Sequence, residues 1–201
     1  MPTLLEQLAS SLDANTLARL GQQAGIDSND ISGAVQAALP ALLGGLTKNV
    51  EQTGGAEQLS RALQKDHDGS ILDNLGSLIG NEDLLGQGQK ILGHVFGQNQ
   101  SKVANGLGQV SKQSGDSMGQ LMAMLAPVVM GVLGKQQQQK SLSGGSLADM
   151  LGQEAKEFAS AQPQSMDFLS GLLDADGDGD VDASDLLNKV PGLLGGLFGK
   201  K

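Results

Sequence analysis

Apolar residues recur along this chain at steps of three and four, and no stretch alternates apolar and polar residues with a period of two. In the first 20 residues the pattern is carried by Leu4, Leu5, Leu8, Leu12, Leu17 and Leu20. Steps of three and four place side chains on one face of a helix, whereas a strand with one buried face needs alternation. The spacing therefore predicts an all-α fold that opens with two amphipathic helices, interrupted and capped by Asp13 and Asn15.

Two further apolar stretches predict buried helices. The first runs from Ile31 to Leu46, and we expect it to bend or break near Pro40, because proline lacks the N–H that a helix interior uses. The second is the run of 13 residues from 121 to 133, shorter than the roughly 20 that cross a membrane. The start of the chain lacks a basic segment followed by a continuous apolar one, so we expect no secretory signal and a cytoplasmic location.

Parts of the sequence recur at fixed offsets. Leu20-Gly21-Gln22 recurs as Leu107-Gly108-Gln109, and Pro40 recurs with the same offset of 87 as Pro127. Further along, the offset is 102: Asp83-Leu84-Leu85 matches Asp185-Leu186-Leu187, and Ile91-Leu92-Gly93 matches Leu193-Leu194-Gly195. These matches predict an internal duplication of small helical units near residues 15–100 and 101–201.

The expected organisation is a helical domain over residues 1–160 and a calcium-binding segment with a Leu- and Gly-rich tail over residues 161–201. Two arrangements of the units stay open: separate small domains, or a single interleaved helical domain. The polar stretch from Gln136 through Ser146 is predicted to be a flexible connector, because Gln, Ser and Gly are typical of solvated linkers.

Composition excludes several function classes. The chain has no Cys, so it can form neither disulfides nor cysteine-based metal sites, and it has no thiol nucleophile. It has no Trp or Tyr, only four Phe, and no cluster of Lys and Arg, so we expect no nucleic-acid partner. Common catalytic motifs are absent, and we expect His94 to be packed or half-buried rather than catalytic. Asp73, Asp83 and Asp116 are predicted to be helix caps.

The most specific pattern is a twelve-residue stretch, DADGDGDVDASD, that fits a calcium loop of the EF-hand type. The predicted ligands are Asp174, Asp176, Asp178, Asp180, Asp182 and Asp185. Calcium takes six to eight oxygen ligands, and alternating Asp side chains on a tight turn converge on one point. Gly179 stands at the sixth position, where the loop turns sharply and the Asp180 main-chain carbonyl becomes a ligand.

The closing position of the loop carries Asp185, where high-affinity loops use the longer Glu. This weakens the case for tight binding and for strong selectivity over Mg²⁺. We expect an entering helix capped by Ser165 and a short exiting helix stopped at Pro191. Removing the six Asp would bring the formal charge of the chain from −9 to −3, so its acidity is mostly local to this loop.

A partial copy of the loop lies at Asp66–Asp73, in the sequence DHDGSILD. Asp66, Asp68 and Gly69 match positions three, five and six, but the first and closing ligands are missing. We predict a structural turn or a weak site here, because too few oxygens remain for tight calcium binding. His67 could ligate another metal, but one His beside two Asp is a weak signal.

Several segments resemble the bacterial family known as domain of unknown function 937. They are LxxLGQQ, IDSNDISGAVQAALPALLGGLTKN, DHDGSILDNLGSLIG, GQKILGHVFG and MLAPVVMGVLGK. The resemblance covers roughly residues 5–155, and several members look similar in ending with an Asp- and Gly-rich loop. It implies a small helical protein of unassigned activity, and the terminal loop is also similar to dockerin-type loops in closing with Asp.

We therefore expect a non-enzymatic helical protein that binds one Ca²⁺, either as a structural ion or as a sensor that exposes the tail to a partner. The alternative is a membrane-surface or self-assembling scaffold in which the calcium loop is incidental. For the tail, VPGLLGGLFGKK, we favour a docked structural helix over membrane contact. For Met118, Met122, Met124 and Met130 we favour core packing over an adaptable binding groove.

Overall fold

The computed structural model describes residues 4–161, and the regular elements of this range are all helices, with no strand. Its elements are α1 (Leu4–Ser11), α2 (Ala14–Ala24), α3 (Ile31–Glu51), α4 (Gly55–Asp66), the 3₁₀ helix η1 (Ser70–Asn74), α5 (Leu75–Leu78), α6 (Glu82–Phe96), the 3₁₀ helix η2 (Gly97–Asn99), α7 (Gln100–Ser111), α8 (Gly115–Lys140) and α9 (Gly144–Ala161). The prediction of an all-α class is confirmed.

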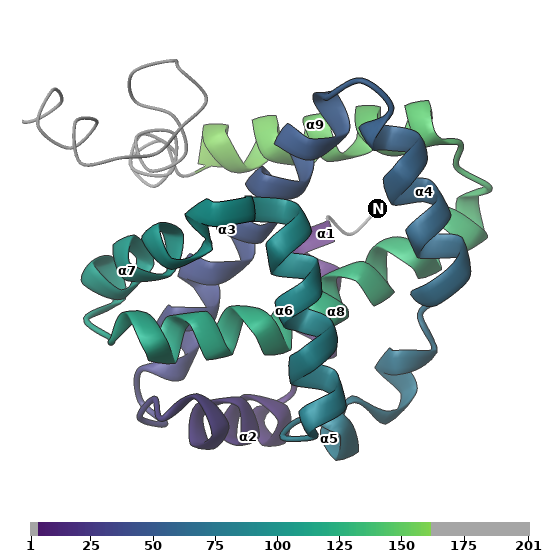
Figure 1. Cartoon of the computed structure of the whole chain (residues 1–201). Coiled ribbons are helices and arrows are strands. Elements are labelled where there is room, and N and C mark those ends of the chain that lie inside the picture. The colour runs from purple at the N-terminus through teal and green to yellow at the C-terminus, as the bar shows by residue number, and fades with distance from the viewer. Residues whose placement is uncertain (1–3, 162–201) are drawn as a thin grey trace, which may run out of the picture.

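Helix α8 lies at the centre, and six other helices contact it: α1, α2, α3, α4, α6 and α7 (Figure 1). Every residue from 121 to 134 is buried, so the prediction of a buried helix is confirmed. Within the described range, α8 alone has the length and apolarity to cross a membrane, but 83% of its most apolar window is buried inside the protein. Burial by neighbouring helices is what a core helix requires, and α8 is therefore weak evidence for a membrane span.

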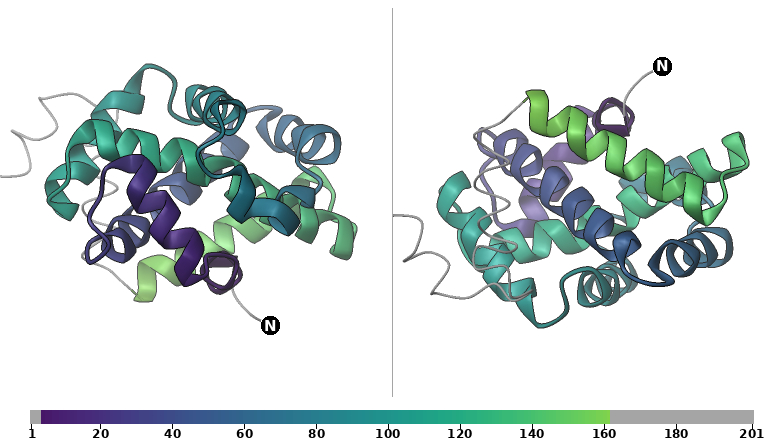
Figure 2. Two further views of the ribbon diagram at one scale, coloured as in Figure 1. Left: turned by 90° about the horizontal axis from the view of Figure 1, so that it is seen from below. Right: turned by 90° about the horizontal axis from the view of Figure 1, so that it is seen from above.

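The buried apolar side chains of residues 4–161 form one cluster, to which helices from both halves of the sequence contribute. Helix α3 contacts both α8 and α9, and α9 runs alongside α3 in the view from above (Figure 2). The expected break at Pro40 does not occur, because α3 runs unbroken from Ile31 to Glu51. Pro40 is itself buried in the core, and the packing around it stabilises the helix although proline lacks the N–H that a helix interior uses.

Short polar side chains fix where helices begin. Asp13 caps α2, since its Oδ1 accepts a hydrogen bond of 2.7 Å from the Thr16 N–H, as predicted. Asn15 lies within α2 rather than capping it. The expected caps Asp83 and Asp116 lie in first helical turns, where a negative charge is also favourable, whereas Asn81 and Ser114 make the capping bonds. The expected cap Asp73 lies within η1.

Helices α2 and α7 end in the same way, 87 residues apart. The Ile26 N–H donates to the Gly21 carbonyl over 2.9 Å, and the Gln113 N–H donates to the Gly108 carbonyl over 2.8 Å. An added Cβ would lie 2.9 Å from the Ile26 oxygen at Gly21 and 2.7 Å from the Gln113 oxygen at Gly108. Each turn therefore needs a glycine at the same place, four residues before the left-handed capping residue.

The prediction of a flexible connector from Gln136 onward is wrong. Helix α8 continues to Lys140 and α9 begins at Gly144, so only three residues connect them. Gln136 and Gln137 are 4% and 3% exposed, and the Gln137 amide donates to the Ser60 hydroxyl and to the Leu142 carbonyl. Composition favours a solvated segment because glutamine is polar, but a buried amide is stable where it finds hydrogen-bond partners.

Glycine lets α6 cross α8 at backbone contact. At Gly88, on the buried face of α6, an added Cβ would lie 1.7 Å from the Ala123 carbonyl oxygen. At Gly86, two residues earlier in the same helix, nothing lies within 4 Å of such an atom. The close crossing therefore depends on one of these two glycines and not on the other.

We expect Gly88→Ala to lower the free energy of unfolding by about 1–3 kcal/mol, because the new methyl group forces the two helices apart. Gly86→Ala should raise it by about 0.5–1 kcal/mol, because alanine is the better helix former. Urea unfolding followed by far-UV circular dichroism measures both changes. If both substitutions changed the free energy of unfolding in the same direction, the close crossing at Gly88 would be contradicted.

Candidate functional site

The predicted calcium loop, residues 174–185, and the segment 162–201 that contains it lie outside the described residues. So do Ser165 and Pro191, the expected boundaries of its flanking helices. Within residues 4–161, no three His, Asp or Glu side chains come together in a way that could hold a metal ion. The described part of the chain nevertheless contains the partial loop at Asp66–Asp73 and a cleft beside it.

The partial loop forms a tight turn that links α4 to η1. Helix α4 ends at Asp66, and Gly69 has a φ of +96°, a conformation that favours glycine. The Asp68 Oδ1 accepts a hydrogen bond of 3.0 Å from the Ser70 N–H. Hydrogen bonds from the hydroxyl and the backbone N–H of Ser70 lower the pKa of Asp68, because they favour its charged form. Asp68 thus stabilises the turn locally.

The same turn packs against glycines of α8. At Gly134 an added Cβ would lie 1.7 Å from the His67 carbonyl oxygen, and at Gly131 it would lie 2.5 Å from the Ile71 Cγ2. The Gln138 amide donates to the Asp68 carbonyl over 3.2 Å. The partial loop is therefore a structural turn seated on the central helix, which agrees with one of the two predictions made for it.

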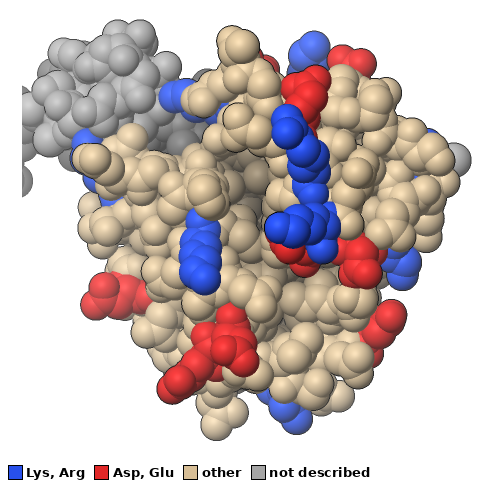
Figure 3. All heavy atoms as spheres, turned by 45° about the vertical axis from the view of Figure 1, so that its right-hand side comes forward, with Lys and Arg blue, Asp and Glu red and all other residues tan. Residues whose placement is uncertain are grey.

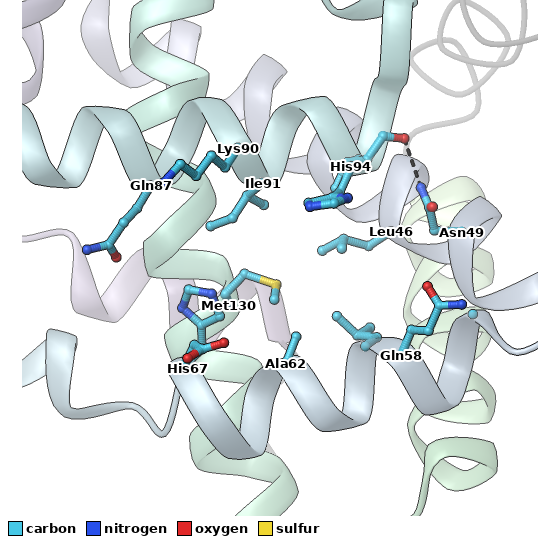
Figure 4. Close-up of a pocket in the computed structure, with 14 residues that line it drawn as sticks. Leu46, Asn49, Gln58, Ala62, His67, Gln87, Lys90, Ile91, His94 and Met130 are labelled. Atoms are coloured by element: carbon cyan, nitrogen blue, oxygen red, sulfur yellow. Dashed lines mark hydrogen bonds between the residues drawn. The ribbon is translucent and has the colours of Figure 1, made fainter.

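A cleft of about 720 Å³ opens between α4 and α6, beside this turn (Figure 4). Its floor is apolar and includes the buried side chains of Leu46, Leu59 and Met130, which come from α3, α4 and α8. At one end the Asn49 amide donates to the Val95 carbonyl over 2.8 Å and joins α3 to α6 (Figure 4). Clefts of this size with an apolar lining are the usual form of small-molecule sites.

Polar side chains line the cleft above this floor, and they include both histidines of the chain, His67 and His94. Both rings lie toward the space between α4 and α6 (Figure 4). Gln58, Gln87, Lys90 and His94 are exposed, and their side chains have no hydrogen-bond or ion-pair partner among residues 4–161. On this side of the molecule, Lys and Arg side chains flank a hollow, and Asp and Glu side chains lie beside some of them and elsewhere on the same face (Figure 3).

Sequence reasoning did not find this cleft. The prediction that His94 is packed or half-buried is wrong, because its side chain is exposed at the cleft. The Met prediction is confirmed, since Met118, Met122 and Met124 are fully buried and Met130 is 4% exposed, although Met130 also contributes to the cleft floor. One sequence feature could have pointed to the cleft: the segments GHVFG and KDHDG contain the only two histidines of the sequence.

Burial lowers the pKa of His67 below its usual value of 6.5, and the neighbouring Asp66 carboxylate partly opposes this shift. The unfolded chain therefore takes up this proton more readily than the folded protein. The stability that His67 contributes is present above pH 6.5 and is lost as the pH falls from 6.5 toward the lowered pKa.

In a ¹H NMR titration we expect the ring signals of His67 to show a transition below pH 6.5. Asp66→Asn should move that transition lower still, because it removes the carboxylate that favours the protonated ring. A His94→Gln variant assigns the two sets of signals. A His67 transition above pH 6.5 would be inconsistent with a ring desolvated in this cleft.

Residues 6–136 match the family described as "Bacterial protein of unknown function (DUF937)". The matched range is more than half of the chain and includes every residue that lines the cleft. No curated protein and no solved structure matches the chain significantly.

Proposed function

We propose that this chain, which belongs to the DUF937 family of bacterial proteins of unknown function, is a non-enzymatic calcium-binding protein. One Ca²⁺ held in the loop 174–185 stabilises or switches the C-terminal segment. The ligands are Asp174, Asp176, Asp178, Asp180 through its carbonyl, Asp182 and Asp185. The observation that carries the proposal is the spacing of these residues around Gly179, which places Asp at every side-chain position that the loop requires.

The partial loop supports this assignment by showing how such a sequence folds in the same chain. Asp68 and Gly69 match Asp178 and Gly179 in their positions within the loop pattern. In the described structure, Gly69 adopts a positive φ three residues after the end of α4, at the loop position where a calcium loop also turns. The partial copy lacks the first and closing acids, and its remaining acids do not form a metal-binding group.

Electrostatics provide a second argument. Six carboxylates within twelve residues repel one another, and a bound divalent cation removes that repulsion. Ion binding and local folding are then coupled, because the loop is most stable with its ion. Asp185 has a shorter arm than Glu, which favours a structural or weak site over a tight sensor.

We extend the proposal to an internal duplication in which 174–185 is the complete loop and 66–73 its partial relative. The shared ends of α2 and α7 support it, as do Pro40 and Pro127 inside α3 and α8. The helix contacts support it too, because α2 contacts α8 as α7 contacts α3, and α4 contacts α8 as α9 contacts α3. A cytoplasmic location is part of the proposal.

In calorimetric titration of chelator-treated full-length protein, we expect one Ca²⁺ to bind per chain. Asp174→Ala with Asp185→Ala should abolish this binding, because the pair removes the first and closing ligands. Asp149→Ala, which removes an exposed acid on α9, is the matched control and should bind as the unaltered protein does. Absence of calcium heat in the unaltered protein would remove the basis of the proposal.

The rival function is a membrane-surface or self-assembling scaffold that uses the Leu- and Gly-rich tail. The protein would then co-sediment with vesicles of phosphatidylglycerol and phosphatidylethanolamine. This co-sedimentation would be unaffected by calcium and lost on deletion of residues 190–201. Concentration-dependent self-association with the same dependence on the tail would equally favour the scaffold.

A further inference from the structure

The cleft between α4 and α6 combines an apolar floor with an unpaired cation at its edge. Leu46, Leu59 and Met130 form a buried floor, and the half-buried Ala62 and Ile91 extend it along both walls. Of these residues, Ala62 and Ile91 leave the most apolar surface open to water, and a hydrocarbon chain lying against the floor would cover it, which is favourable by about 25 cal/mol per Å². Methionine at its centre suits chains of varying shape, because the thioether is flexible and polarisable.

The polar groups above the floor indicate the sign of the head group. Lys90 on α6 is a cationic side chain with no carboxylate partner among the described residues. His94 lies one helical turn further along the same wall, and its ring is a hydrogen-bond donor in either neutral tautomer. On the opposite wall, Asp66 would repel an anion, so an anionic head is favoured on the α6 side.

We propose that this cleft binds a fatty acid, with one unbranched hydrocarbon chain on the floor of Leu46, Leu59 and Met130 and its carboxylate at Lys90. The volume of about 720 Å³ lies within the range of small-molecule sites. A charge-assisted hydrogen bond from lysine to a carboxylate fixes the orientation of the ligand, and the chain supplies most of the affinity. This site is independent of the calcium loop.

The test uses full-length protein in EDTA, so that the calcium loop is empty of metal. An environment-sensitive fluorescent fatty acid, 11-(dansylamino)undecanoic acid, reports occupancy. Dodecanoate, dodecanol and dodecyltrimethylammonium then compete with it, the two ions below their micelle-forming concentrations and the alcohol below its solubility limit. We expect dodecanoate to bind about tenfold more tightly than dodecanol, and the cation to bind most weakly, because only the carboxylate pairs with Lys90.

Two variants separate the head-group contact from the floor. Lys90→Gln should weaken dodecanoate about five- to tenfold and leave dodecanol unchanged, whereas Lys102→Gln, an exposed lysine on α7 outside the cleft, should change neither. Ala62→Phe fills the floor and should weaken all three competitors. Because Lys90 is exposed, its substitution leaves the core intact, and circular dichroism checks the fold of each variant.

The ring signals of His67 and His94 give a second measurement that needs no fluorescent ligand. Dodecanoate should shift both sets in ¹H NMR, and Ala62→Phe should suppress the shifts. Failure of every competitor to displace the probe would overturn the proposal. Equal affinity for the three head groups, or an unchanged dodecanoate affinity in Lys90→Gln, would overturn it as well, since the cleft would then be only an apolar patch.

Discussion

The close approach of backbones to α8 is the interaction on which the described structure depends. A helix surrounded by six others needs room on every side, and this chain supplies the room by omitting side chains where backbones meet. Gly88 allows α6 to reach the carbonyl of Ala123, and Gly134 allows the end of α4 to place the His67 carbonyl beside α8. Large apolar residues, among them Leu121 and Leu125, then fill the remaining space. A methyl group at either glycine would collide with the neighbouring backbone and force the helices apart.

Local patterns predicted the helices well because each pattern depends on a few neighbouring residues. Asp13 was identified as a cap from its place before an apolar stripe, and the run 121–133 as buried from its length and apolarity. The predictions failed where contacts between residues far apart in the sequence determine the local structure. Pro40 is accommodated by packing across α3, and Gln137 by the Ser60 hydroxyl, 77 residues away. No local pattern carries that information, so composition predicted a connector where α8 continues, and the break that proline can cause does not occur near residue 40.

The same distinction applies to function. The proposed calcium loop could be predicted from the sequence because its candidate ligands lie within twelve consecutive residues, where a spacing pattern alone suggests it. The cleft was missed because its walls come from four helices between Leu46 and Met130, and no short segment carries more than one side of it. The partial loop at Asp66–Asp73 could be interpreted only in part from its sequence. Its residues matched a loop pattern, but its contacts with Gly131 and Gly134 are what identify it as a structural turn.

Two contacts in which a glycine lets α8 meet a neighbouring backbone also determine how the cleft can respond to what enters it. Gly88 holds one wall, α6, against the backbone of α8, and Gly134 holds the end of the other wall, α4, against the same helix. Backbone contacts of this kind leave no side chain that could rotate to widen the gap. The spacing of the two walls is therefore set where their backbones meet α8. A ligand that enters the cleft would be accommodated by movement of the side chains that line it, such as Met130 and Lys90, rather than by separation of the walls.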